Sequence, residues 1–350
     1  MVRIYMRLTL FVQSETDTKM IIKRFIKKTT HFLFSELFPP RFSYVNWISD
    51  NQKPNTFWIE RLIRIYHLQR KRPIRFYSLF GKRETIDEKF PGIKIFFSGE
   101  NLEPYVHHSC LLEDEKSSYR TFFKNQIPSY ADYAIGSVNL SLGFGNRKDD
   151  NYLRLPLWMI QFFPPTINKT EIKKILDNIE TRHNSFTSKN AVIVARHDFF
   201  GSRKIICSDL EKITEIDYAG KWNNSTDILY TKYNDDKQKL LREYKFNICA
   251  ENQDAPFYVT EKLYQAFIGG CIPIYQGALN DPEPDVINKD AVILWNFDSS
   301  NDANLLLVDN LIHDQKVYND FISRPKFKPY AAEFICDTFS DLRSRLNKIL

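Results

Sequence analysis

The residues of this 350-residue chain that could do chemistry gather directly after segments predicted to be buried strands. In chain order they are Glu100 and Asn101 after segment 93–99, Arg196, His197, Asp198 and then Arg203 after 190–195, Lys221 after 215–220, and Tyr258, Glu261 and Lys262 after 245–252. Arginine and lysine bind phosphate oxygens through charge-assisted hydrogen bonds, so two or three of these cations could hold a pyrophosphate. A separate carboxylate in a facing domain could then act as a general base.

One lysine of this set lies at a predicted helix start within residues 257–277, FYVTEKLYQAFIGGCIPIYQG. Thr260 is a favourable N-cap, apolar residues recur after it at helical spacing, and Gly269-Gly270 ends the helix before a short apolar strand. A helix N-terminus presents free N–H groups and a positive dipole end, so Lys262 there would add to a phosphate seat. On these residues alone, an ordinary amphipathic helix with a solvated first turn is the simpler interpretation.

Other nucleotide-binding and metal-binding motifs do not occur in the sequence. There is no Walker A loop and no GxGxxG, and SLGFGNR at 141–147 lacks the third glycine and is interpreted as a loop. No HExxH occurs, so no metal site is expected. The basic run at 61–75 has an apolar side and is interpreted as a solvated helix face, and no nucleic-acid partner is expected.

The elements that must position these residues alternate between strands and helices. The first half is predicted to hold strands at 43–49, 74–80 and 93–99, helices at 55–70 and 83–89, and further apolar segments at 131–138 and 152–158. The second half is predicted to hold strands at 190–195, 215–220, 245–252, 271–277 and 291–296, with helices at 201–213, 235–243 and 260–268. This alternation predicts mostly parallel α/β sheets, whose ligands bind at the carboxyl ends of strands.

A proline pair followed by a polar stretch separates the two halves, so we expect two Rossmann-like domains that face each other across a cleft. The predicted divisions are an N-terminal domain at 1–163, a linker at 164–189, a C-terminal domain at 190–330 and a final helix at 331–350 that could pack back on the first domain.

Composition limits the classes of partner and compartment. The net charge of +6 suits an anionic ligand, and the aromatic share of 15% indicates large cores or sugar-stacking surfaces. Five widely spaced cysteines without a CxxC pair predict free thiols in a reducing compartment. No apolar run approaches the roughly 20 residues that span a bilayer, and no signal peptide is evident. A soluble, cytoplasmic protein is expected, with peripheral membrane contact left open.

Residues 244–277, YKFNICAENQDAPFYVTEKLYQAFIGGCIPIYQG, resemble the donor-binding signature of the α-1,3/1,4-fucosyltransferases, glycosyltransferase family 10. Further similar segments occur in the same order: KIFFSGEN at 94–101, DYAIG at 132–136, YLRLPL at 152–157, Arg203, and YAGKWNN at 218–224. The resemblance covers residues 43 to 300, approximately, and its main motif is long and specific.

The resemblance implies a GT-B enzyme of glycan biosynthesis and protein glycosylation that transfers fucose from GDP-β-L-fucose, with inversion, to a hydroxyl of a GlcNAc- or glucose-containing glycan. No metal or cofactor besides this donor is implied. The implied roles are Glu100 as general base, Arg203 and Lys262 on the pyrophosphate, and Asn252, Tyr258 and Glu261 on the nucleotide or fucose. Arg196 and Lys221 are further candidates for donor binding, although many relatives carry Ser-Asn where this chain has Arg196-His197.

Alternatives stay open at this point. Glu100 could be a helix-start carboxylate held by backbone N–H groups, and Arg203 could be a surface residue of its helix. A GT-B transferase could use another sugar nucleotide, and an inactive chain could bind a nucleotide sugar or a glycan. The acceptor would be contacted by loops within 101–130 and 137–151.

Overall fold

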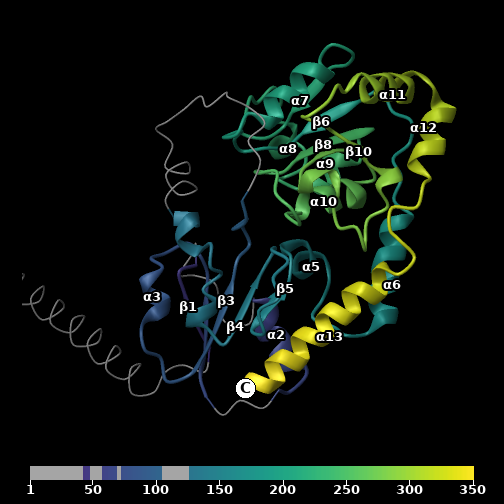
Figure 1. Cartoon of the computed structure of the whole chain (residues 1–350). Coiled ribbons are helices and arrows are strands. Elements are labelled where there is room, and N and C mark those ends of the chain that lie inside the picture. Colours follow the sequence, from purple (N-terminus) through teal and green to yellow (C-terminus); the bar gives the residue numbers. More distant parts are fainter. Residues whose placement is uncertain (1–41, 48–56, 69–71, 105–125) are drawn as a thin grey trace, which may run out of the picture.

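The structure is a computed structural model and describes residues 42–47, 57–68, 72–104 and 126–350. These residues form two parallel β-sheets, one from each half of the chain, with helices packed around them (Figure 1). The predicted α/β architecture with two parallel sheets is therefore confirmed.

The N-terminal sheet has its strands in chain order, and every neighbouring pair is parallel. The strands are β1 (Phe42–Val45), β2 (Ile74–Tyr77), β3 (Ile93–Phe97), β4 (Leu140–Gly143) and β5 (Tyr152–Arg154). The helices are α2 (Trp58–Ile65), α3 (Glu84–Asp87) and α5 (Leu157–Phe162), with 3-10 turns η2 (Ile127–Tyr130) and η3 (Ile135–Ser137).

Strand β4 corrects the interpretation of segment 141–147 as a loop for residues 141–143, while residues 144–147 do lie in a loop. All four residues of β4 are buried, and the Ser141 hydroxyl donates to the Tyr133 carbonyl at 2.6 Å. A Cβ at Gly143 would lie 2.7 Å from the Tyr133 ring. Serine and glycine therefore serve close packing inside the sheet here, where their usual preference is for loops.

The C-terminal sheet is also parallel, with the strand order β10-β9-β8-β6-β7. The strands are β6 (Ala191–Ile193), β7 (Ile216–Tyr218), β8 (Phe246–Ala250), β9 (Ile272–Gln276) and β10 (Ile293–Leu294). The order reverses between β6 and β8, since β7 lies on one side of β6 and the later strands lie on the other. Parallel sheets bind ligands outside the carboxyl ends of the strands at such a reversal.

The helices of the second half connect these strands and then return to the first half. They are α6 (Lys169–Glu180), α7 (Ser202–Leu210), α8 (Ile228–Thr231), α9 (Lys237–Leu241), α10 (Glu261–Gly269), α11 (Asp302–His313), α12 (Gln315–Ile322) and α13 (Ala331–Ile349), with 3-10 turns η4 (Ala278–Asn280) and η5 (Lys289–Ala291). Helix α6 lies within the predicted linker, and the domain boundaries themselves stay predictions.

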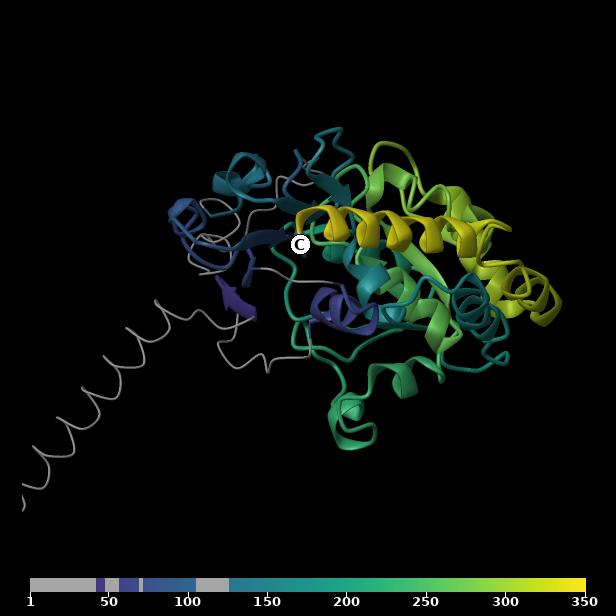
Figure 2. The same cartoon turned by 90° about the horizontal axis from the view of Figure 1, so that it is seen from below.

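Helix α13 is the last helix in the sequence, and it lies against α2 and α6 (Figures 1 and 2). The Phe339 ring lies 4.7 Å from the Trp58 ring, centroid to centroid, and both side chains are buried. Because Ile335, Phe339 and Leu346 recur at helical spacing and are all fully buried, one apolar stripe attaches this helix to the first half.

A buried ion pair connects the two halves near the start of α10. The Arg154 guanidinium donates to both carboxylate oxygens of Glu283, at 2.6 and 3.1 Å, and the Trp158 indole N–H donates to the same carboxylate at 2.7 Å. The Trp158 ring stacks on Tyr264 of α10 with centroids 4.4 Å apart. This contact fixes β5 and α5 against α10, the helix that carries Lys262.

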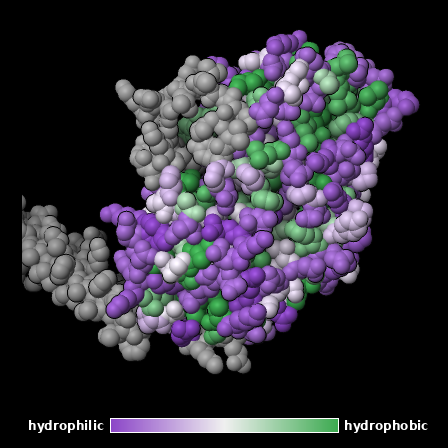
Figure 3. All heavy atoms as spheres, in the orientation of Figure 1, coloured by the Kyte–Doolittle hydropathy of each residue, from purple (hydrophilic) through white to green (hydrophobic). Residues whose placement is uncertain are grey.

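Cys207, Cys249, Cys271 and Cys336 are free thiols, the first three of them buried, while Cys110 lies outside the described residues. Among the helices of the described part, none combines the length and apolar character that crossing a membrane requires. Figure 3 shows a largely hydrophilic face, with hydrophobic residues gathered mainly over the C-terminal half near α11 and α12.

Removing the Phe339 ring tests the attachment of α13. We expect Phe339→Ala to lower the free energy of unfolding by about 3 kcal/mol, because the change leaves a cavity against Trp58. Urea denaturation followed by tryptophan fluorescence measures this loss. Ser340→Ala, on the exposed side of the same helix, is the control and should change little. Equal effects of the two changes would contradict the packing role.

Candidate functional site

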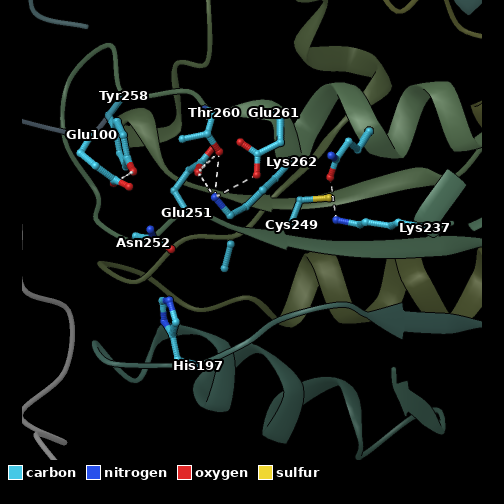
Figure 4. A network of polar contacts seen from close by, with 12 residues as sticks. Glu100, His197, Lys237, Cys249, Glu251, Asn252, Tyr258, Thr260, Glu261 and Lys262 are labelled. Atoms are coloured by element: carbon cyan, nitrogen blue, oxygen red, sulfur yellow. Dashed lines mark hydrogen bonds and ion pairs between the residues drawn. The ribbon is translucent and has the colours of Figure 1, made fainter. Parts of the chain in front are cut away.

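A buried carboxylate, Glu251, organises the start of α10 (Figure 4). It follows directly after β8, and its Oε1 accepts the backbone N–H of Thr260 at 2.8 Å. Its Oε2 accepts the Thr260 hydroxyl at 2.6 Å and the Lys262 ammonium at 2.9 Å. One side chain thus holds the residue before the helix and the second residue of the helix.

Thr260 occupies the predicted N-cap position, but its side chain does not cap the helix. The hydroxyl is engaged by Glu251 and by Lys262, whose ammonium donates to it at 2.8 Å. The first backbone N–H groups of α10 therefore have no side-chain cap. An uncapped helix N-terminus favours an anion, since unpaired N–H groups and the positive dipole end coincide there.

Lys262 is held as a cation at this helix start. Burial disfavours its charged form, but the carboxylates of Glu251 and Glu261 outweigh that effect and raise the pKa of Lys262. The Glu261 carboxylate lies 3.9 Å from the ammonium. Burial likewise opposes ionisation of Glu261, yet the Lys262 charge and the helix backbone lower the pKa of this carboxyl below its usual value. Both side chains are therefore charged at neutral pH.

The Arg203 guanidinium spans the strand-order reversal between β6 and β8. It donates to the carbonyls of His197 and Ala250, the latter at 3.2 Å, and to Asn252 Oδ1 at 3.0 Å. Burial lowers the pKa of Arg203, and among the described residues no carboxylate oxygen lies within 4.0 Å of its guanidinium nitrogens. A buried cation without a carboxylate partner favours the binding of an anion.

Glu100, after β3, faces the C-terminal half. The Tyr258 hydroxyl donates to Glu100 Oε2 at 3.1 Å, and the neighbouring Asn101 amide donates to Gln253 Oε1 at 3.1 Å. Burial raises the pKa of Glu100 to about 7, against the opposing effects of the Lys262 charge and the Tyr258 hydrogen bond. A carboxyl with a pKa near neutrality changes between acid and base at physiological pH, as a general base requires.

Arg196 and Lys221 are exposed at the rim of the same edge. The two loops that carry them touch, because a Cβ at Gly220 would lie 2.0 Å from the Ala195 carbonyl oxygen, so only glycine fits. Between this rim and Arg203, burial and the surrounding cations lower the pKa of His197 to about 4. His197 is therefore neutral at physiological pH and adds no charge.

The structure brings most of the predicted site residues together, from the segments that follow β3 in the N-terminal sheet and β6 and β8 in the C-terminal sheet. Figure 4 shows all of them except Arg203. This group comprises Glu100, Arg203, Asn252, Tyr258, Glu261 and Lys262. Sequence reasoning missed Glu251, which was counted as a residue inside the predicted strand 245–252, whereas β8 ends at Ala250. The feature that could have identified Glu251 is the position of an acidic residue directly after β8, whose five residues are all buried. Within the expected acceptor loops, residues 105–125 lie outside the described structure.

Across the described ranges, no group of three or more His, Cys, Asp and Glu side chains is arranged to hold a metal ion. The cationic groups at the strand ends are instead arginine and lysine. The arrangement can therefore bind a multiply charged anion between Arg203 and the start of α10, with a base of neutral pKa facing it from the other half.

Comparison with known proteins places this geometry among glycosyltransferases. Residues 184–346 match glycosyltransferase family 10 (fucosyltransferase), C-terminal part, and residues 42–161 match the α-(1,3)-fucosyltransferase FucT N-terminal domain. A solved α1,3-fucosyltransferase with GDP-fucose superposes with a TM-score of 0.53 at 18% identity, over 87% of this chain and 89% of that one. The likeness shows the fold, and the predicted GT-B class is confirmed.

Two curated relatives match over shorter segments. α-(1,3)-Fucosyltransferase B of Drosophila melanogaster is 31% identical over 134 residues, 35% of this chain and 30% of the relative. α-(1,3)-Fucosyltransferase FucT of Helicobacter pylori is 28% identical over 192 residues, 47% of this chain and 38% of the relative. The chain thus matches less than half the length of either relative.

Breaking the buried pair tests the organising role of Glu251. We expect Glu251→Gln to lower the free energy of unfolding by about 3 kcal/mol, because the Lys262 ammonium, which is only 19% exposed, loses its fully buried carboxylate partner. Adding Lys262→Met should restore most of that stability, since no unpaired charge remains. Chemical denaturation measures both variants.

The control is Asp281→Asn, which removes an exposed ion pair of similar length with Lys289 and should cost less than about 1 kcal/mol. If Glu251→Gln is no more harmful than this control, Glu251 does not organise the helix start.

Proposed function

The chain belongs to glycosyltransferase family 10, and from this premise we propose that it transfers L-fucose from GDP-β-L-fucose, with inversion, to a hydroxyl of a GlcNAc- or glucose-containing glycan. The observation that carries the proposal is the Glu100 carboxyl, with a pKa of about 7, beside Tyr258 and facing the cationic start of α10. A base and an anion seat on opposite sides of one site are what inverting transfer requires.

In the proposed reaction, ionised Glu100 takes the proton of the acceptor hydroxyl while that oxygen bonds to the anomeric carbon of fucose. The bond from that carbon to the diphosphate oxygen breaks on the opposite face, so the configuration inverts. Positive charge develops on the sugar ring as this bond breaks, as in inverting glycosidases. Glu100 then carries the proton until solvent removes it.

Negative charge grows on the leaving diphosphate during this step. Arg203, which has no carboxylate partner among the described residues, and the Lys262 ammonium at the uncapped start of α10 support a seat for that charge. Such prearranged cations and N–H groups stabilise developing charge without reorganising. Asn252 orients Arg203, while Tyr258 and Glu261 contact the fucose or the nucleotide in this proposal. We also propose that the reaction needs no metal ion, because Arg203 and Lys262 neutralise the diphosphate charge that a metal ion would otherwise neutralise.

A donor panel tests the proposed donor and separates it from the alternatives. We expect acceptor-dependent GDP release from GDP-fucose and at least tenfold less release from GDP-mannose, UDP-galactose or UDP-GlcNAc. Assays with N-acetyllactosamine, lactose and chitobiose, with and without EDTA, measure this release. Preference for another donor would indicate a different GT-B transferase. Tight GDP binding without any turnover would indicate a binding protein.

The role of Glu100 has its own test. We expect Glu100→Gln to lower kcat at least a hundredfold with GDP affinity within threefold, because the base is lost and the donor seat stays. In the unchanged protein, kcat/KM should rise with pH and level off above about 7, as Glu100 loses its proton. The variant should lack this rise. Glu171→Gln, an exposed carboxylate of α6, is the control. A variant with the same pH dependence as the parent would remove Glu100 from the base role.

A further inference from the structure

A hollow in the surface is lined by residues from both halves of the chain. It is a cavity of about 510 Å³ lined by residues 103–104 and 146–149 of the N-terminal half and by Pro256-Phe257 of the C-terminal half. Phe257 immediately precedes Tyr258, whose hydroxyl contacts Glu100, and Glu103 is three residues beyond Glu100. The cavity is therefore lined, on both halves, by residues that closely follow or precede the Glu100–Tyr258 contact in the sequence.

Phe257 is held at this cavity in an unusual backbone conformation. Its φ of 63° lies in the left-handed region, which is costly for a bulky residue and persists where surrounding contacts enforce it. The Phe257 carbonyl accepts from Arg154 at 3.0 Å and from the Val259 backbone N–H at 3.1 Å. The Arg154 guanidinium also lies over the Phe257 ring, 5.5 Å from its centroid. Since Glu283 holds Arg154, the ring is fixed by the ion pair that connects the two halves.

The part of the lining that the N-terminal half contributes at Glu103 is fixed as well. The buried Asn101 side chain accepts the Glu103 backbone N–H at 3.0 Å and donates to the Glu103 carbonyl at 2.8 Å. Its contact with Gln253 attaches this turn to the C-terminal half. Both parts of the lining are thus preorganised, which reduces the entropy lost when a ligand binds.

The charges around the cavity are balanced. The lining holds two acidic residues, Glu103 and Asp149, and two basic ones, Arg147 and Lys148, and the Arg147 Nε lies 3.1 Å from Asp149 Oδ2. A lining with both signs gives no net attraction for a diphosphate or an acidic sugar. It contains both hydrogen-bond donors and acceptors, which suits the hydroxyl groups of a neutral sugar, while an aromatic ring supplies apolar contact at low entropic cost.

We propose that this cavity binds the neutral pyranose of the acceptor glycan, with the Phe257 ring as its packing surface. The proposal rests on the transferase function above and adds to it a residue that determines acceptor affinity. In this proposal Phe257 holds the acceptor sugar so that the sugar hydroxyl to be fucosylated points toward Glu100. Phe257 is a positioning residue here, since it touches the acceptor sugar and takes no part in proton transfer.

The test compares Phe257→Asn with Phe257→Trp. Asparagine adopts the left-handed conformation readily, so the first change keeps the backbone and removes the ring, while the second keeps an aromatic surface. We expect Phe257→Asn to raise the acceptor KM at least tenfold with kcat within threefold, and Phe257→Trp to stay within threefold of the parent. GDP affinity, measured by calorimetry, should not change. Tyr330→Ala is the control, since it removes a different exposed aromatic ring at the start of α13.

Saturation-transfer NMR with N-acetyllactosamine, lactose and chitobiose, in the presence of GDP, gives a readout that needs no turnover. A glycan signal in the parent that is lost in Phe257→Asn supports the site, even if GDP-fucose is never cleaved and the transferase proposal fails. An equal signal and an equal acceptor KM in both proteins overturn the site and leave the transferase standing. Loss of GDP affinity in Phe257→Asn, or no glycan signal in the parent, also overturns it.

Discussion

The candidate site depends on one buried ion pair, between Glu251 at the end of β8 and Lys262 in the first turn of α10. Removing two charges from water is unfavourable, and this pair offsets that cost through hydrogen bonds on both sides. Glu251 accepts four of them, from the Thr260 amide, the Thr260 hydroxyl, the Lys262 ammonium and, at 3.4 Å, the Tyr275 hydroxyl. The same contacts draw the Thr260 hydroxyl away from the helix N–H groups. The pair therefore fixes the position of the cation and leaves the helix start open to an anion.

The electrostatics of the two halves are connected through this arrangement. The Lys262 charge acts on Glu100 in the other half and limits how far burial raises the pKa of that carboxyl. Without a nearby cation the pKa of this carboxyl would be higher, and a direct ion pair would make it lower. Its pKa of about 7 lies between these limits. The C-terminal part of this site follows from topology, since β6 and β8 border the strand-order reversal. The segment after β3 reaches it through the contacts of Glu100 with Tyr258 and of Asn101 with Gln253.

Much of this arrangement could be predicted from the sequence, and the remainder has a physical reason. The alternation of apolar strands and helices predicted two parallel sheets. Because such sheets bind ligands at the carboxyl ends of their strands, Glu100, Arg203 and Lys262 could be predicted as site residues. Partners remote in sequence left no local signal: Arg154 and Glu283 are 129 positions apart, and each is an ordinary charged residue when considered alone. Thr260 was predicted to cap its helix because propensity describes the isolated chain, whereas a buried acceptor nearby competes for its hydroxyl. Strand β4 was missed because Ser141 and Gly143 have loop-like preferences that close packing overrides.

The return of α13 to the first half affects the order in which the molecule can be completed. Trp58 and the apolar face of α2 receive their covering from residues 335–346, which a ribosome adds after both sheets have been translated. During synthesis the first half therefore presents an uncovered apolar surface for nearly the whole time that the second half is being made. Domains of multidomain chains commonly fold one after another as they emerge. In this chain the N-terminal half lacks part of its packing until α13 has been synthesised, so the apolar side of α2 waits longest for its covering.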